Sequence, residues 1–536
     1  MSKVKPEDCI AIDFGTSNTA VYVYKDKKFD NPVCTADTNY CIPSVAVIDK
    51  SGITVSDKVI KSQPSKGYIY SVKRILGKNK HQFEESEIGE EVFHSPLNFD
   101  DPQNPYFEVS YGAGNLAGSR NVYPIEVATE ILKKCKEVAE TRLDSHLDVR
   151  NCVMTIPNNF FDTSKKVLRE AAKRAGLNVL YFLKEPTAAG ICCLEDKEKI
   201  KNEKGEKVID LGIKEGEMVM VFDFGGGTLD LTLMVRNGDD FDVKAQGGDP
   251  SLGGDKIDEI FCKYVLQIYQ NKNGEELLGD NVGSKRYKKK YTKLLDLCRE
   301  GKEQLSASVK FDIPLGDFNV EHDDMLITVE EFNGNVMKII QSRIDTALEN
   351  DIFKRNIDQI KHVILVGGSS KIPFIHNYIR QWIPNAKVHR SHSPHTVVVE
   401  GAMRHLVNEY NVEEVFEDSL GFEVNKEMSE HFYPGIRLPC STIRYFTFYN
   451  NRDDNKIKVH RKVNGKWRIE GVIDLQAAYE MGIRTGQTVQ IRVTCTNDTS
   501  VTYTVLGRGR KAIGTLDLSL VFSVCSNPLK MVYTNC

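Results

Sequence analysis

The chain has 536 residues, of which 40% are hydrophobic and 27% are charged, and its formal net charge is −4. This length exceeds a single hydrophobic core and indicates a globular protein of several domains, while the near balance of charge argues against a nucleic-acid-binding body. The 13 cysteines are scattered without a Cys-x-x-Cys pair, and no signal peptide or membrane-length apolar run is present, so we expect a cytoplasmic protein with no disulfide framework and no membrane partner.

The first predicted element is a β-hairpin over residues 9–21, in which an apolar strand ends at Asp13 and the turn reads Gly15-Thr16-Ser17-Asn18. Such a turn offers backbone N–H groups to an anion, and its hydroxyl groups can bond phosphate oxygens. The carboxylate of Asp13 lies beside the turn, where it can orient a hydrated Mg²⁺. A single hairpin leaves open the alternative that the Asp only bonds its own turn.

Helices and strands then alternate, which predicts an α/β sheet. Pro124 opens the first helix, and Gly176 ends the second. The predicted elements are a helix over 125–143, a strand over 151–156, a helix from 162 or 163 to 175, a strand over 179–183 and a helix from 185.

A second hairpin, over residues 218–235, repeats the first about 210 residues later. Asp223 occupies the place of Asp13, and the turn reads Gly225-Gly226-Gly227-Thr228. Three consecutive glycines weaken a strand, so they indicate a close approach of the backbone to phosphates. Two such hairpins facing each other predict a metal–polyphosphate clamp between two duplicated lobes.

The second half continues in the order of the first. A helix-rich insertion, a helix, a strand and a further helix are expected at 255–310, 329–349, 363–366 and from about 372. The turn Gly367-Gly368-Ser369-Ser370 can hold the α-phosphate or sugar of a nucleotide, or can be a plain strand-to-helix turn. There is no P-loop, and Asp-Phe-Gly occurs without the catalytic loop of a protein kinase.

The periodicity of hydrophobic residues changes after about residue 410. Segments of period two, at 444–448, 456–459, 489–493 and 501–505, predict an antiparallel β-sandwich of about 110 residues. The acidic stretch Val412–Asp418 before it, with a small apolar centre at Val415-Phe416, is interpreted as a linker.

Taken together, these motifs resemble the seventy-kilodalton heat-shock chaperones, the heat shock protein 70 family of the actin-like ATPase superfamily. The resemblance runs from about residue 9 to 405 and rests on both hairpins and on the motifs between and after them. These further motifs are Thr155-Ile156-Pro157, Ala175–Leu180, Glu185-Pro186-Thr187-Ala188-Ala189, Gly248-Asp249, Leu252-Gly253-Gly254 and Val366-Gly367-Gly368-Ser369.

The resemblance implies an α/β fold, with a duplicated actin-like (ribonuclease H-like) two-lobed ATPase domain followed by a small antiparallel β-sandwich. We expect the nucleotide-binding domain at 1–408, with lobes at about 9–215 and 216–408, a linker at 409–418, and a peptide-binding sandwich without a helical lid at 419–536. Pro157 would relay the nucleotide state to the neighbouring domain.

The resemblance also implies the residues of the site and its ligands: ATP or ADP, Mg²⁺, and a monovalent cation such as K⁺. The catalytic residues would be Lys73, Glu185, Asp223 and Thr228. Asp13, Asp223 and Glu185 would hold the hydrated Mg²⁺, and Asp230 would lie near the monovalent cation. The nucleotide would be bound by Gly15, Thr16, Ser17, Asn18, Gly225, Gly226, Gly227, Thr228, Gly254, Lys302, Ser306, Gly367, Gly368, Ser369 and Lys371.

The chain departs from the family at the adenine end of the site. Positions where the family places an Arg on each face of the adenine hold Glu303 and Lys371, and a usual acidic position holds His395. Arg stacks on a base, whereas Lys does so poorly and Glu cannot, so we expect weaker or differently arranged adenine binding.

The leading hypothesis is an ATP-binding, slowly ATP-hydrolysing molecular chaperone of the stress-response type, in which the nucleotide state controls binding of unfolded or nascent polypeptide. J-domain and nucleotide-exchange co-chaperones are the expected partners, with no nucleic acid. The alternative is a regulatory, non-hydrolysing partner of a co-chaperone or the ribosome that binds ATP structurally. A small-molecule kinase or filament former of the same superfamily is a third possibility, against which the linker and sandwich argue.

Overall fold

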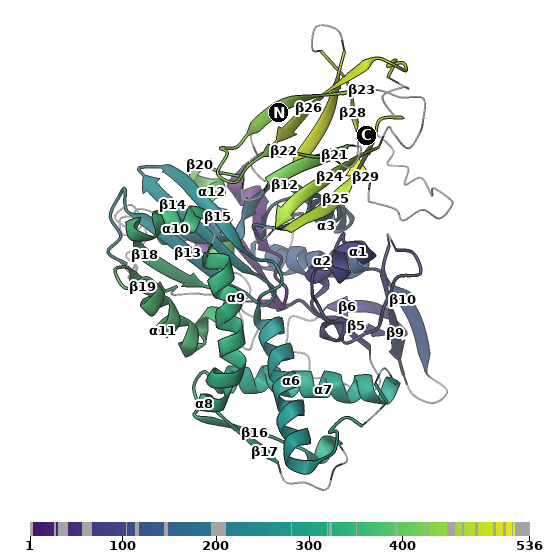
Figure 1. Ribbon diagram of the computed structural model, residues 1–536, viewed down its shortest axis with the longest axis vertical. Coiled ribbons are helices and arrows are strands. Elements are labelled where there is room, and N and C mark those ends of the chain that lie inside the picture. Colours follow the sequence, from purple (N-terminus) through teal and green to yellow (C-terminus); the bar gives the residue numbers. More distant parts are fainter. Residues whose placement is uncertain are drawn as a thin grey trace. The chain divides into compact units, whose positions relative to one another are not determined.

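The computed structural model describes residues 4–519 apart from 26–27, 31–40, 56–66, 103, 113–116, 144–147, 195–210, 280, 283, 319, 321–323, 350, 392–394, 417–418, 425–426, 448–455, 464–465, 477–480, 497–499, 508–510 and 517. The chain divides into two units, Met1–Glu417 and Asp418–Cys536, each described by itself below (Figure 1). The boundaries expected from the sequence, a nucleotide-binding domain ending at 408 and a linker ending at 418, stay a prediction.

The first lobe of unit 1 is built on a sheet whose strands run in the order β12-β11-β1-β2-β3, with β4 paired to β2. β1 and β2 form the first predicted hairpin, and β1 also pairs with β11 in parallel. All residues of β1 before Asp13 are buried, as expected for a strand in the middle of a covered sheet. The strands are β1 (Cys9–Asp13), β2 (Asn18–Lys25), β3 (Lys28–Asp30), β4 (Ile42–Pro43), β11 (Asn151–Ile156) and β12 (Asn178–Lys184).

The crossover helices of this lobe are α2 (Pro124–Leu143) and α3 (Asp162–Arg174), which pack against each other. α3 is amphipathic and buries Leu168, Ala171 and Ala172. The helix ends before Gly176, whose φ of 79° is the left-handed conformation that a glycine provides after a helix. The helices predicted at 125–143 and 162–175 are therefore confirmed to within a residue or two.

The second lobe repeats this plan, with strand order β19-β18-β13-β14-β15-β20. β13 and β14 form the second predicted hairpin, β13 runs parallel to β18, and β18 runs parallel to β19. Hairpin and parallel neighbours thus occupy the same places as in the first lobe. The strands are β13 (Met218–Phe224), β14 (Leu229–Asn237), β15 (Asp240–Asp249), β18 (Ile360–Val366), β19 (Lys387–Arg390) and β20 (Asn411–Glu413).

Each lobe carries additional elements beside its main sheet (Figure 1). In the first lobe these are β5 (Ala46–Asp49), β6 (Gly52–Val55), β7 (Gly67–Ile69), α1 (Lys80–Glu84), β8 (Leu97–Asn98), β9 (Tyr106–Tyr111) and β10 (Gly118–Val122). In the second lobe they are α6 (Gly254–Asn273), α7 (Lys285–Gln304), β16 (Lys310–Ile313), β17 (Met325–Thr328) and α8 (Val329–Glu331). A π-helical turn, Phe332–Met337, leads from α8 into α9 (Lys338–Leu348), and α10 (Asp351–Asn356) and α11 (Pro373–Trp382) follow.

Two helices join the lobes through their backbones. α4 (Glu185–Leu194) packs on α12 (Val397–Asn408) and also on β13 and β14. A Cβ on Gly401 of α12 would lie 1.8 Å from the carbonyl oxygen of Ala188 in α4, so even a methyl group at this position requires the backbone to move. The helix that begins at Glu185 is therefore fixed between the two sheets.

The segment interpreted as a linker is partly built into the second lobe. β20 pairs with β15 in parallel, with Phe241 opposite Val412. The buried carboxylate of Glu414 accepts hydrogen bonds from Thr187 of α4 at 2.8 Å and from Gln246 of β15 at 2.6 Å. Residues 411–414 thus belong to the packed structure of unit 1.

Unit 2 consists of two antiparallel sheets, with strand orders β22-β21-β24-β25-β29 and β23-β26-β27-β28. Alternate residues of β26 are buried, from Val489 to Cys495, as the period-two pattern predicts. The ring of Phe422 on one sheet lies 6.2 Å from that of Tyr503 on the other, so the inner faces pack together. The strands are β21 (Ser419–Val424), β22 (Glu427–Phe432), β23 (Cys440–Thr447), β24 (Lys456–Val463), β25 (Lys466–Asp474), β26 (Thr488–Cys495), β27 (Val501–Leu506), β28 (Ala512–Leu516) and β29 (Leu518–Ser519).

Duplicated α/β lobes followed by antiparallel sheets confirm the predicted fold class. Of the strand predicted at 444–448, residue 448 lies outside the described residues. Within the described part of the chain, no helix is long and apolar enough to cross a membrane.

Candidate functional site

The two glycine turns face each other between the lobes. A Cβ on Gly226 would lie 2.4 Å from the hydroxyl oxygen of Ser17, and a Cβ on Gly227 would lie 2.5 Å from that of Thr16. Side chains at these two glycines would close the space between the turns. The structure therefore brings the two hairpins together in the arrangement that a shared phosphate clamp needs.

A lysine and four carboxylates lie beside these turns. The Lys73 ammonium contacts the Glu185 carboxylate at 2.6 Å, with both side chains nearly buried. Asp13 accepts a hydrogen bond from the Thr155 hydroxyl at 2.9 Å, and Asp223 and Asp230 are direct neighbours across the β13–β14 hairpin. The fold thus gathers the predicted catalytic and metal-binding residues from both lobes.

A network of hydrogen bonds fixes Asp230. One of its carboxylate oxygens accepts from the backbone N–H of Asn158 at 2.8 Å, and the other accepts from the Thr228 hydroxyl at 2.7 Å. The Asn158 amide also donates to the carbonyl oxygens of Leu231 and Gly247 at 3.1 and 3.2 Å. Asn158, directly after Pro157, ties the end of β11 to the second lobe.

Burial and crowding shift the titration of this cluster. Burial raises the pKa of Glu185 to about 8, against the lowering effect of Lys73. Burial, followed by repulsion from the neighbouring carboxylates, raises the pKa of Asp223 well above its ordinary value. Burial likewise raises the pKa of Asp13 and Asp230. Lys73 and the buried Lys184, which faces Asp230, do not balance four carboxylates, and a bound divalent cation would return them to their charged forms.

The donor set fits a hydrated Mg²⁺. Mg²⁺ prefers oxygen ligands and keeps several of its waters, so carboxylates often hold it through water. Among the described residues, no group of three His, Cys, Asp or Glu side chains is arranged to ligate one ion directly. Asp13, Glu185 and Asp223 are thus suited to hold the ion through its water shell, which stays a prediction.

Sequence analysis missed a contribution from the 3₁₀ turn Val72–Arg74. The buried Arg74 guanidinium donates to the carbonyl oxygen of Gly227 at 2.8 Å, and Ser71, with a φ of 51°, donates to Asp255 at 2.9 Å. These bonds hold the first lobe against the glycine turn of the second. The available signals were weak: Arg74 follows Lys73, and Asp255 follows a pair of glycines.

The predicted sugar end of the site is also assembled. The Ser369 hydroxyl donates to the carbonyl oxygen of Gly225 at 2.8 Å. The Lys302 ammonium lies 3.1 Å from the carbonyl oxygen of Gly254 and 2.7 Å from Asp258, and Ser306 donates to the Lys302 carbonyl oxygen at 3.1 Å. Gly367 has a φ of 81° and lies against Phe224 and Asp223, so its conformation suits a glycine.

The departures expected at the adenine end are visible. The exposed Lys371 ammonium lies 2.7 Å from Nε2 of His395, and partial burial and the lysine charge lower the pKa of this imidazole. His395 also lies close to Gly368, 3.7 Å from the place of a Cβ. Glu303 is exposed on α7, so exposed polar side chains gather at the adenine end. Asn18, which belongs to the predicted phosphate turn, is exposed at the start of β2.

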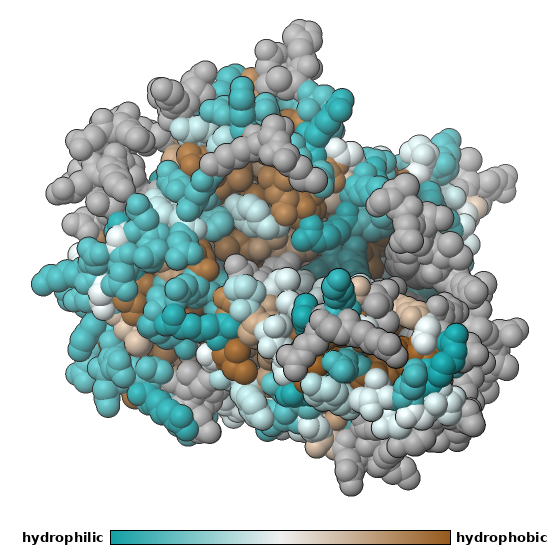
Figure 2. Space-filling model, turned by 90° about the horizontal axis from the view of Figure 1, so that it is seen from above, coloured by the Kyte–Doolittle hydropathy of each residue, from teal (hydrophilic) through white to brown (hydrophobic). Residues whose placement is uncertain are grey.

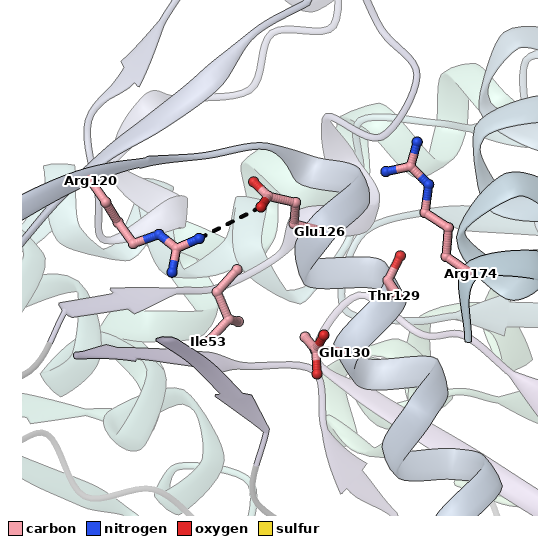
Figure 3. A pocket seen from close by; sticks show the side chains of 6 residues that line it. All are labelled: Ile53, Arg120, Glu126, Thr129, Glu130 and Arg174. Carbon is pink, nitrogen blue, oxygen red and sulfur yellow. Dashed lines mark ion pairs between the residues drawn. The ribbon is translucent and has the colours of Figure 1, made fainter. Parts of the chain in front are cut away.

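A separate pocket of about 220 Å³ lies in the first lobe (Figure 3). Its charged side chains are paired: Arg120 lies 3.6 Å from Glu126, and Arg174 lies 3.0 Å from Glu170. The lining holds none of the predicted site residues; it consists of Ile53, Arg120, Glu126, Thr129, Glu130 and Arg174.

Facing phosphate turns between two lobes of repeated sheet order define an actin-like nucleotide-binding protein. Residues 9–426, well over half of the chain, match the Hsp70 protein family, and the chain belongs to that family. The family expected from the sequence is thereby confirmed, and the chain is an ATP-binding chaperone of the Hsp70 type. Members of this family are generally ATPases that bind ATP or ADP, unfolded polypeptides and co-chaperones.

Proposed function

We propose that this protein binds Mg-ATP between its two lobes and hydrolyses it slowly, and that the nucleotide state controls how the β-sandwich holds unfolded or nascent polypeptide. J-domain and nucleotide-exchange co-chaperones are the proposed partners, and the cytoplasm is the proposed location. The observation that carries the proposal is the Lys73–Glu185 pair at 2.6 Å beside the facing glycine turns.

Each residue of the cluster has a separate proposed role in hydrolysis. Lys73, oriented by Glu185, is placed to neutralise the charge of a terminal phosphate. The Thr228 hydroxyl, which donates to Asp230 at 2.7 Å, is positioned to order a water molecule. Asp223, buried at the end of β13 beside the second glycine turn, would accept the proton of that water molecule. Bound Mg²⁺ would supply charge neutralisation of the phosphates.

Unit 2 offers surfaces suited to an extended polypeptide. Met428 on β22, Tyr433 just after it and Tyr445 on β23 are exposed by 38%, 51% and 58%. β22 and β23 end the two sheet orders found in the described residues, and a free strand edge can pair with an added strand. Figure 2 shows one face of the whole chain, on which hydrophobic residues gather in patches between hydrophilic ones. Apolar side chains beside strand edges support recognition of unfolded chains.

A single-turnover ATPase assay on the wild type and Lys73→Ala tests the proposal. We expect Lys73→Ala to bind ATP but to lower the hydrolysis rate at least about a hundredfold, as removal of one positioned charge does. Lys263→Ala is a matched control, because Lys263 contacts Glu259 at the same 2.6 Å but lies exposed on α6. It should hydrolyse ATP at the wild-type rate.

The same assay separates the alternative function. Equal rates for the wild type and Lys73→Ala, with ATP still bound, would overturn hydrolysis and favour a regulatory partner that binds ATP structurally. The adenine end, where Lys371 contacts His395, is the observation that favours this alternative.

A further inference from the structure

Unit 2 holds two thiols directly opposite each other. Cys440 begins β23 and Cys495 ends β26, and the two are register partners in this antiparallel pair. The Cys495 thiol donates to the Thr496 carbonyl oxygen at 3.8 Å, and it lies near enough to Cys440 to shift the pKa of that thiol. Directly opposed residues on antiparallel strands have Cα atoms about 4.5–5.5 Å apart, which is within the range that a disulfide spans.

The two cysteines differ in their access to solvent. Cys495 belongs to the buried face of β26, whereas Cys440 is half-buried. β23 lies at one end of the order β23-β26-β27-β28, so its first residue is reached from the edge of that sheet. The neighbouring Cys495 thiol also lowers the pKa of Cys440, and a larger thiolate fraction speeds attack on an oxidant.

We propose that Cys440 and Cys495 are a redox modification site, at which a two-electron oxidant of the peroxide class forms a reversible disulfide between β23 and β26. In the first step, the Cys440 thiolate attacks one peroxide oxygen; the S–O bond forms, the O–O bond breaks and hydroxide leaves. In the second step, the Cys495 sulfur attacks the Cys440 sulfenic acid; the S–S bond forms and water leaves with the thiol proton. Two thiols lose two electrons, and hydrogen peroxide becomes two waters.

A second pair of thiols provides an internal control. Cys262 on α6 and Cys298 on α7 are also neighbouring thiols, but both are fully buried, and burial raises the pKa of Cys298 well above its ordinary value. These two thiols lie close together, but an oxidant in solution does not reach them. We therefore expect this pair to stay reduced under the same treatment.

The test treats the full chain with hydrogen peroxide and maps its disulfides by mass spectrometry of non-reduced peptides. Cys34, Cys525 and Cys536, which lie outside the described residues, are changed to serine in the background protein. We expect a Cys440–Cys495 peptide lacking two hydrogen atoms, at least about tenfold more abundant than any other pair, and its loss on adding thiol reductant. The disulfide should raise the thermal midpoint of unit 2 by at least about 4 °C.

Two variants separate the steps. In Cys495→Ser, the sulfenic acid has no partner, so dimedone should label Cys440; in Cys440→Ser, which changes the less buried residue, neither disulfide nor label should form. The proposal is overturned if Cys440 pairs with another cysteine, if Cys262–Cys298 oxidises first, or if Cys440 reaches sulfinic acid while Cys495 remains a thiol.

Discussion

Replacing Gly401 by alanine tests the contact between α12 and α4. The new Cβ would lie 1.8 Å from the Ala188 carbonyl oxygen and 2.6 Å from its carbon, so backbone rather than a flexible side chain must move. Overpacking of this kind costs up to about 3 kcal/mol, while alanine in place of glycine recovers about 1 kcal/mol of helix propensity. We therefore expect Gly401→Ala to lower the free energy of unfolding of unit 1 by about 2 kcal/mol.

A second glycine offers the matched control. No atom lies within 4 Å of the Cβ position on Gly334, which belongs to the π-helical turn Phe332–Met337. The same substitution there should leave packing unchanged and raise the free energy of unfolding by up to about 1 kcal/mol. The two variants thus differ in sign for one chemical change.

The chain contains two tryptophans, Trp382 in unit 1 and Trp467 in unit 2. With Trp467 changed to phenylalanine, urea unfolding followed by the fluorescence of Trp382 reports unit 1 alone. A Gly401→Ala protein as stable as its parent would refute the reasoning, because it would mean that α4 and α12 are not in backbone contact.

Three further predictions concern the site and the sandwich. Because folding raises the pKa of Glu185 from 4.5 to about 8, nucleotide-free unit 1 binds more protons than the unfolded chain between these values. Its free energy of unfolding should fall by about 1 kcal/mol from pH 7 to 8, and Glu185→Gln should flatten this slope in urea titrations; an unchanged slope would contradict the assignment. In Gly227→Ala the new Cβ would meet Thr16, so calorimetry should show ATP binding at least about tenfold weaker than in the wild type. Gly316→Ala, with no atom near its Cβ, should bind ATP as the wild type does. Equal ATP affinities of the two variants would argue against facing turns. The buried Arg461 lies 3.1 Å from the Glu470 carboxylate, which Glu470→Gln removes. This variant should lower the free energy of unfolding of unit 2 by about 3 kcal/mol. The double variant Arg461→Met with Glu470→Leu should lower it far less, because it removes both charges. Trp467 fluorescence in a Trp382→Phe background measures both, and equal losses would contradict the ion-pair account.

The parts of the fold that the sequence predicts are those with local signals. Both hairpins combine an apolar strand, an aspartate and a glycine turn, and both occur, as β1–β2 and β13–β14. The duplication of this pattern also predicted that the two hairpins face each other with Asp13 and Asp223 on opposite lobes, since equivalent strands occupy equivalent places in two equivalent sheets.

The parts that escaped prediction depend on contacts distant in sequence. Arg74 donates a hydrogen bond to Gly227, 153 residues later in the sequence, and Asn158 donates one to Asp230, 72 residues later. No local sequence pattern around Arg74 or Asn158 predicts these contacts. β20 covers only the three residues Asn411–Glu413, one of them charged, so its pairing with β15 at a sheet edge left no periodic signal. Arg461 and Glu470 lie in period-two strands, where charged residues usually indicate a solvated face, but here they are buried.

The repeated sheet order has a consequence for binding energy. Each lobe by itself carries one glycine turn and one strand-end aspartate, Asp13 or Asp223, which is half of a site. A polyphosphate that touches both halves is also a bridge between them, so its affinity includes the free energy of bringing the lobes together. Any change that makes separation of the lobes easier must weaken the ligand, and any tighter ligand must hold the lobes more firmly, by the same amount. The affinity of a polyphosphate measured at this site therefore reports the free energy of separating the two lobes.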